Sequence, residues 1–273
     1  MEHMYLPVVV RGAGDLATGV IQKLHSAGFS VYALETERPS AIRRCVSLCE
    51  AVYDGRAEVE DITAVLIGRP DEAAAVFEAG QVPLLVDPAA RSIEQIRPLA
   101  VIDAVLAKKN TGLSLAAAPV TIGLGPGFTA GVDCDVVIET MRGHDLGKLI
   151  YRGSAMPNTG NPGEIGGYAV ERVIRAPHAG TVRLVRQIGD LIEAGETALM
   201  VDATAVPSPL SGVIRGLIRD GYEVTERFKI GDVDPRLGER KNCYTISDKA
   251  RALGGATLEA VLLQLRQKGL WPC

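Results

Sequence analysis

A glycine-rich loop near the N-terminus is the pattern in this sequence with the clearest chemistry. Gly12-x-Gly14-x-x-Ala17 follows the β-branched run Val8–Val10 and precedes apolar residues spaced as in a helix. Glycines let a backbone approach a pyrophosphate closely, and a helix N-terminus offers free N–H groups and about half a positive charge. A plain tight turn between strand and helix is the alternative. The predicted phosphate-binding residues are Gly12, Ala13, Gly14, Asp15, Leu16 and Ala17.

Glu35 comes at the end of the next predicted strand, Val31–Leu34, where a dinucleotide fold holds a ribose hydroxyl. The spacing Gly14-x-x-x-x-Gly19 is also half of a Walker loop. However, Val20-Ile21 stands where that loop requires a phosphate-binding lysine and a magnesium-binding hydroxyl. The sequence therefore excludes a P-loop NTPase and adds Glu35 to the predicted nucleotide site.

Three later groups of residues are candidates for the same ligand site. Each lies in a turn or loop after a predicted strand, where ligands bind in parallel sheets. His144 could be an acid, a base or a phosphate partner, and a surface turn residue is the alternative. The asparagines lie in a glycine-rich segment, residues 153–167, for which a flexible interdomain linker is the alternative. The candidates are Gly125, Gly127, Phe128, His144, Asn158, Thr159 and Asn161.

Several other kinds of site are excluded or weakly supported. The four histidines have no zinc-ligand spacing, there is no Cys-x-x-Cys, and no Gly-x-Ser-x-Gly marks a hydrolase. Cys45 and Cys49 would share a helix face and are interpreted as buried small hydrophobes. Cys134 lies between two aspartates, which should raise its pKa and so disfavour a reactive thiolate. No metal ligand is predicted, and no catalytic residue can be named.

Composition limits the class of protein. The chain has 273 residues and a net charge of −4, with 47% hydrophobic and 23% charged residues. This length suggests two domains, and the mild negative charge argues against nucleic-acid binding. No apolar run approaches the roughly 20 residues needed to cross a bilayer, and no secretion signal is evident. Five scattered cysteines favour a reducing, cytoplasmic location, and the sequence leaves a homo-oligomer open.

The first half of the chain alternates predicted strands and helices. Buried-looking strands recur at 82–86, 100–106, 120–124 and 136–139, with helices at 16–27 and 71–79 and a second helix over 39–50. Apolar strands alternating with helices predict a parallel sheet covered on both faces. Residues 1–150 are therefore expected to form a Rossmann-like domain of the α/β class that binds a nucleotide or phosphate.

The second half has short β-rich segments and an internal repeat at an offset of 32 residues, in which Pro177 matches Pro209 and Gly180 matches Gly212. The spacing resembles the biotinyl/lipoyl barrel-sandwich fold, so residues 168–246 are expected to form a small β module. The hairpin at 201–207 has no lysine, which predicts that the module carries neither biotin nor lipoate and serves as a docking or shielding lid. Residues 247–273 are expected to be helical, with Ser247 capping one helix and Thr257 another.

Several longer motifs resemble the YqeB family of the selenium-dependent molybdenum hydroxylase system. They are the sequences at 12–19, 123–131, 142–147, 158–163 and 230–236, together with Gly254-Gly255. The resemblance covers nearly the whole chain. It implies an accessory protein for the maturation of molybdenum hydroxylases, distantly related to the XdhC/CoxF maturation factors.

Three hypotheses of function follow. The first is a maturation factor that binds a nucleotide or a molybdopterin-type cofactor and has a molybdenum hydroxylase, or its maturation machinery, as a partner. The second is an NAD(P)-dependent oxidoreductase that uses the same glycine loop. The third is a non-catalytic interaction protein in which the loop is vestigial.

Overall fold

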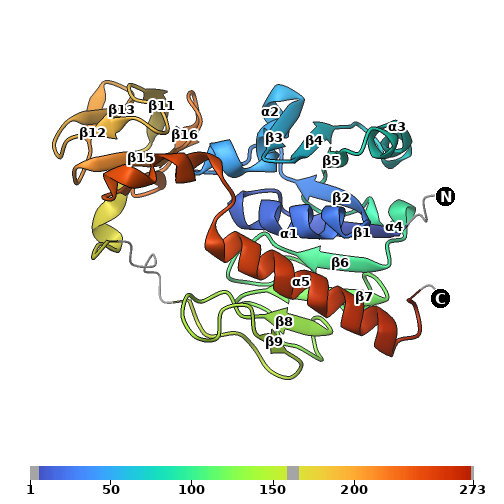
Figure 1. Cartoon of the computed structure of the whole chain (residues 1–273). Coiled ribbons are helices and arrows are strands. Elements are labelled where there is room, and N and C mark those ends of the chain that lie inside the picture. The colour runs from blue at the N-terminus through green and yellow to red at the C-terminus, as the bar shows by residue number, and fades with distance from the viewer. Residues whose placement is uncertain (1–5, 159–165, 272–273) are drawn as a thin grey trace. The chain divides into compact units, whose positions relative to one another are not determined.

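The computed structural model describes residues 6–158 and 166–271, in which the chain forms two structural units (Figure 1). The C-terminal helical segment, expected by itself at 247–273, clusters with the first unit, and a short stretch after residue 39 clusters with the second. The first unit comprises Met1–Pro39, Ser47–Asn158 and Ile246–Cys273, and the second comprises Ser40–Val46 and Thr159–Thr245.

The first unit is built on a nine-stranded sheet in the order β3-β4-β5-β2-β1-β6-β7-β8-β9. Every neighbouring pair from β4 to β8 is parallel, and the two outermost pairs, β3 with β4 and β8 with β9, are antiparallel. The strands are β1 Pro7–Arg11, β2 Ser30–Glu35, β3 Arg56–Val59, β4 Ile62–Leu66, β5 Val82–Val86, β6 Ala100–Asp103, β7 Val120–Leu124, β8 Val136–Ile138 and β9 Leu149–Ile150.

The central strands match the apolar runs in the sequence. All five residues of β1 and of β7 are buried, as expected for strands covered on both faces. The order β5-β2-β1-β6-β7-β8 means that the chain first adds strands on one side of β1 and then continues on the other side. A switch point therefore lies between β1 and β6, and the carboxyl ends of both strands meet there.

Two helices lie side by side on this sheet, α1 Asp15–Ser26 and α5 Asp248–Gln267 (Figure 1). Two helices were expected in the C-terminal segment, but α5 is continuous, and the Thr257 hydroxyl donates to the Leu253 carbonyl instead of capping a new helix. Packing explains the glycines inside these helices. A Cβ at Gly19 would collide with the Ala250 carbonyl, and one at Gly254 with the Gly19 carbonyl.

The prediction of a helix over residues 39–50 is wrong. Two single 3-10 turns, Arg44–Val46 and Leu48–Glu50, stand there, separated by the extended residue Ser47. The Leu48 amide donates to the Thr18 hydroxyl and the Cys49 amide to the Ala13 carbonyl. These amides therefore bond to the start of α1 and the loop before it, and not to carbonyls one helical turn earlier in their own segment. The segment continues as the short helix α2, and Cys45 and Cys49 do not share a helix face. The remaining short helices are α2 Ala51–Asp54, α3 Ala73–Glu78 and α4 Ile93–Ile96.

The second unit consists of two four-stranded antiparallel sheets, β10-β17-β15-β12 and β14-β13-β11-β16. Side chains from both sheets share one apolar core. The strands are β10 Val173–Arg175, β11 Gly180–Leu184, β12 Leu191–Ile192, β13 Thr197–Val201, β14 Thr204–Pro207, β15 Gly212–Leu217, β16 Glu223–Val224 and β17 Lys229–Asp234.

The structure explains the internal repeat. Strands β11 and β15 begin at Gly180 and Gly212, and β12 and β16 begin at Leu191 and Glu223, so each pair keeps the offset seen in the sequence. With this offset, β10 to β13 form the first copy and β14 to β17 the second, and each sheet combines two strands from each copy. Neither copy therefore completes a sheet by itself, as expected for a repeat that cannot bury its apolar face alone. The finer resemblance to the biotinyl/lipoyl fold stays a prediction.

Candidate functional site

The two glycines of the predicted phosphate loop have different structural roles. Gly12 has φ +93°, and a Cβ there would lie 3.1 Å from the Ala104 carbonyl carbon, so the turn and its packing against the end of β6 require glycine. Gly14 has φ −71° and is the N-terminal cap of α1. No atom lies within 4 Å of the position a Gly14 Cβ would take. The fold thus accounts for Gly12, whereas Gly14 faces open space at the start of the helix.

Glu35, predicted to hold a ribose hydroxyl, lies against this loop, and its contact with a nucleotide stays a prediction. Its carboxylate accepts hydrogen bonds from the Ala13 amide and the Thr36 amide, each at 2.8 Å. Burial raises the pKa of Glu35 above its ordinary value, and the two amide hydrogen bonds oppose that rise. The end of β2 therefore presents a carboxylate held by the backbone of the β1–α1 loop.

Lys249, in the first turn of α5, belongs to the same region and was missed by sequence reasoning. Burial lowers the pKa of its ammonium group, and the nearby Arg142 guanidinium lowers it further, while Asp15 and Glu139 raise it. Arg142 itself pairs with Asp248 through two N–O distances of 2.8 and 2.9 Å. The packing of α1 on α5 thus brings a lysine near the loop and near the residues after β8. The in-helix glycines were the one sequence signal for that packing.

The turn after β7 is explained by packing. Gly125 has φ +80° and Gly127 has φ +110°, and a Cβ at either would lie 2.6 Å from Thr140 Oγ1 or from the Lys109 backbone. Phe128, predicted as a ligand contact, is 3% exposed and belongs to the apolar core. Its ring therefore packs inside the unit, where an apolar side chain is most stable.

The remaining predicted residues are only partly described. His144 and Asn158 are exposed, and Thr159 and Asn161 lie outside the described residues. The start of the glycine-rich segment packs against the turn after β7, because the Ala130 amide donates to the Gly153 carbonyl at 2.8 Å. Whether His144 or Asn158 contacts a ligand stays a prediction.

Glu139, a residue that the sequence did not single out, fixes this loop. It is 2% exposed, and its carboxylate accepts hydrogen bonds from the Met141 amide at 2.7 Å and the Met156 amide at 2.8 Å. One buried carboxylate thus ties both ends of the segment from 141 to 156 to the end of β8. Because it follows the last parallel strand, Glu139 lies at the same edge of the sheet as the glycine loop.

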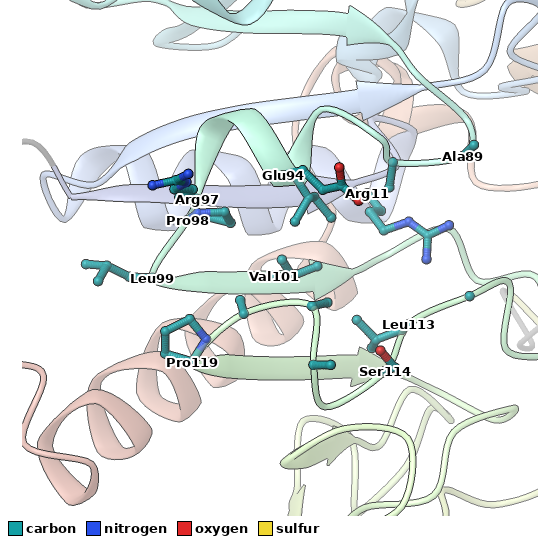
Figure 2. Close-up of a pocket in the computed structure, with 16 residues that line it drawn as sticks. Arg11, Ala89, Glu94, Arg97, Pro98, Leu99, Val101, Leu113, Ser114 and Pro119 are labelled. Atoms are coloured by element: carbon teal, nitrogen blue, oxygen red, sulfur yellow. The ribbon is translucent and has the colours of Figure 1, made fainter.

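A cavity of about 650 Å³ lies alongside β6 (Figure 2). Figure 2 shows Val101 at its middle, Pro119 and Leu99 at one end and Arg11 at the other. Arg11 is 5% exposed and pairs with Asp103 at 2.7 Å, while burial raises the pKa of Asp103 despite the guanidinium. Among the described residues that line the cavity, none is a predicted site residue.

The thiols and the acidic residues do not form a metal site in the part of the chain that the structure describes, where no group of three or more potential metal ligands occurs. Burial raises the pKa of Cys134 to about 12, in the direction expected from its acidic neighbours. Within residues 6–158 and 166–271, each helix is too short or too polar to span a membrane.

No protein-family model matches the chain. Product-bound and apo structures of the ectoine utilization protein EutE (DoeB) from Ruegeria pomeroyi each cover 84% of this chain, or 58% and 86% of their own chains. Their identities are 12% and 8% and their TM-scores 0.23 and 0.25, too low to support any argument about fold or function.

A curated relative is far more similar to this chain than the EutE structures are. The protein named "Uncharacterized protein YqeB" from Escherichia coli (strain K12) is 50% identical over 260 residues, which is 95% of this chain and 48% of that protein. The chain thus spans about half the length of this relative. The similarity supports the YqeB family that the motifs indicated, for the part of YqeB that the chain covers.

Proposed function

We propose that this protein is an accessory factor in the maturation of a molybdenum hydroxylase, and that its first unit binds a nucleotide or a molybdopterin-type cofactor. The observation that carries the binding part of the proposal is the open space at Gly14, where the N-terminus of α1 meets the carboxyl ends of the parallel strands. The partner part rests on the resemblance of the sequence motifs to the YqeB family.

The strand order supports a dinucleotide-type site. The sequence β5-β2-β1-β6-β7-β8 is that of a Rossmann-like sheet, which binds its ligand at the switch point next to β1. A phosphate placed before Gly14 would accept hydrogen bonds from the first amides of α1 and gain from the helix dipole. The nearby Lys249 would add a positive charge.

Glu35 favours a particular ligand within this class. A carboxylate at the end of the second strand accepts a hydrogen bond from a ribose 2′-hydroxyl and repels a 2′-phosphate. This feature also fits the second candidate, an NAD-dependent oxidoreductase. Glu35→Ala is expected to weaken binding of NAD(H) more than that of NADP(H) if a nucleotide is the ligand, and equal losses would remove Glu35 from the site.

The identity of the ligand is tested directly. The protein is purified under native conditions, and mass spectrometry identifies any small molecule carried with it. Saturation binding is then measured for NAD(H), NADP(H), a cytosine dinucleotide and molybdopterin. Tight binding of molybdopterin or the cytosine dinucleotide supports the maturation factor, and preferential binding of NAD(H) supports the oxidoreductase. Binding of none of them supports the interaction protein with a vestigial loop.

Gly14→Val tests the location of the site. The fold should survive, because φ at Gly14 is ordinary and the new side chain enters open space. Ligand binding should be abolished, since charge-assisted hydrogen bonds of about 1.5–3 kcal/mol each are lost. Gly238→Val is the matched control, because its Cβ also meets nothing within 4 Å and its φ is not positive. A folded Gly14→Val protein with unchanged calorimetric affinity would contradict the proposed site.

A further inference from the structure

The cavity alongside β6 exists because two connections on the sheet lack long helices. Adjacent parallel strands are usually joined by a helix that packs over them. The connection from β6 to β7, residues 104–119, contains no helix, and α4, in the connection from β5 to β6, has only four residues. The cavity lies between these two connections, with Val101 of β6 at its middle (Figure 2). The fold therefore leaves this part of the sheet open instead of covering it with a helix.

The side chains that line the cavity are mostly apolar and short. Five of the sixteen lining residues are alanines, and Val101 and Leu113 are also apolar. Short side chains leave room close to the backbone, and the volume of about 650 Å³ lies within the range of about 300–1,000 Å³ that is typical of small-molecule pockets. A ligand with an apolar body would remove this lining from water, which is favourable. The cavity is therefore suited to an apolar molecule of ordinary ligand size.

Arg11 lies at one end of the cavity, and its side chain is 6% exposed. Its Nη1 donates to Asp103, and its Nη2 donates to the Thr111 carbonyl at 3.1 Å and to the Thr111 hydroxyl at 3.3 Å. A guanidinium has five N–H groups, so two of them have no partner among the described residues. The charge of Arg11 is already balanced by Asp103, a buried carboxylate. This end of the cavity therefore favours a neutral hydrogen-bond acceptor or an apolar group over a second anion.

Arg97 lies at the opposite end, beside Pro98 and Leu99 (Figure 2). Its side chain is exposed, and no described residue forms an ion pair or a hydrogen bond with its guanidinium. Glu94, on the same wall, lies between the two arginines and is likewise exposed. A ligand carboxylate at Arg97 would meet an unpaired cation, whereas a carboxylate nearer the middle of the cavity would be repelled by Glu94. The charges thus favour an anionic group at the Arg97 end only.

We propose that this cavity binds a small carboxylic acid with an apolar body, which places its carboxylate at Arg97 and its body over Val101. Because Arg97 is exposed, the carboxylate keeps contact with water, and the ion pair avoids the cost of burying two charges. The planar guanidinium also matches the geometry of a carboxylate. All lining residues belong to the first unit, and none belongs to the glycine loop, so the inference goes beyond the proposed function and does not depend on it.

The probes are 4-phenylbutyrate, 2-naphthoate and octanoate, three acids that differ in the shape of the apolar body. Each is titrated into the full chain, and calorimetry is expected to show saturable binding of one molecule per chain. The uncharged 4-phenylbutanamide has the same body as 4-phenylbutyrate and should bind about three- to fivefold more weakly, the loss expected for an exposed ion pair. Gly14→Val should bind the acids as the wild type does. Loss of acid binding in that variant would place the acids at the glycine loop and overturn the proposal.

Two variants locate the ligand within the cavity. Arg97→Gln should lower the affinity for 4-phenylbutyrate to that for the amide and leave the affinity for the amide unchanged. Arg56→Gln is the matched control, because Arg56 is an exposed residue on the edge strand β3 and does not line the cavity. Ala117→Leu fills part of the cavity and should weaken binding of the acid and the amide alike, where circular dichroism shows a folded protein.

Two results would overturn the proposal. The first is equal affinity of Arg97→Gln and Arg56→Gln for 4-phenylbutyrate, which would remove the carboxylate from Arg97. The second is the absence of saturable binding for all three acids, which would favour a protein segment as the occupant of the open part of the sheet.

Discussion

The glycine loop of the first unit and the cluster of three cations around Asp232 in the second are built in opposite ways. The loop is made of backbone: its features are the start of α1, the open space at Gly14 and one carboxylate, Glu35, held by amides. The cluster is made of side chains aimed by two β-bulges. The loop is consequently visible in a sequence as a run of glycines, whereas the cluster is scattered over more than fifty residues.

Charge balance also differs between the two units. In the first unit, the buried Arg11 guanidinium pairs with one carboxylate, Asp103, and also donates to Thr111. In the second, one carboxylate serves three cations. The Arg11 guanidinium thus depends on a single carboxylate, while the Asp232 carboxylate is shared among several cations. This contrast leads to the predictions that follow.

The largest effect is expected from Asp103→Asn. The substitution leaves the buried Arg11 charge without its carboxylate, which typically costs about 3–5 kcal/mol in the free energy of unfolding. Urea denaturation measures this loss. Asp232→Asn should also destabilise the protein, because it removes the carboxylate that Arg172, Arg215 and Lys229 share. An unchanged urea midpoint for Asp103→Asn would contradict the dependence of the first unit on the Arg11–Asp103 pair.

A smaller loss of stability is expected from Gly254→Ala, which tests the dependence of the first unit on close backbone contact. The new methyl group would collide with the Gly19 carbonyl of α1, and overpacking of this kind costs about 1–3 kcal/mol. Gly255→Ala is the control in the same helix, since its Cβ meets nothing within 4 Å and alanine favours helices by about 0.8–1 kcal/mol. The melting temperature should therefore fall for Gly254→Ala and rise for Gly255→Ala. A change of melting temperature in the same direction for both variants would show that the packing of α1 on α5 does not require this close contact.

A weaker, pH-dependent effect is expected at Glu35. Because its pKa in the folded protein is raised above the ordinary value of 4.5, protonated Glu35 stabilises the fold below that pH. This contribution is lost as the pH rises through the raised pKa. The stability of the wild type should therefore fall relative to Glu35→Gln over this window. Denaturation of both proteins across the window gives the difference, and a constant offset would contradict the burial of this carboxylate.

No covalent attachment of biotin or lipoate to the second unit is expected, so the intact mass of the chain should not change. Strands β13 and β14 form the antiparallel hairpin predicted at 201–207, with Val201 opposite Thr204, and the hairpin contains no lysine to modify. The chain is expressed together with biotin and lipoate ligases, and its intact mass is measured. A shift by one biotinyl or lipoyl group would show that the module is a carrier and not the docking element we expect.

Much of the first unit could be predicted from the sequence because the information is local. The runs at 82–86 and 120–124 form β5 and β7 with the predicted bounds. Ser247 caps α5 through a hydrogen bond from the Ala250 amide, as the sequence predicted. The place of Glu35 at the end of the second strand also followed from the spacing of strand, loop and strand, whereas its hydrogen bond with the Ala13 amide did not.

The sequence by itself therefore determined the alternation of strands and helices, the glycine loop with Glu35, and the repeat of the second unit, because periodicity and glycine spacing act within short stretches of chain. The tertiary structure alone decided that α5 continues through Gly254-Gly255 and that Phe128 is buried. It also decided the Arg11–Asp103 pair and the grouping of cations around Asp232. Each of these depends on which distant backbone lies opposite, and strand register and helix packing are fixed only when the whole core forms.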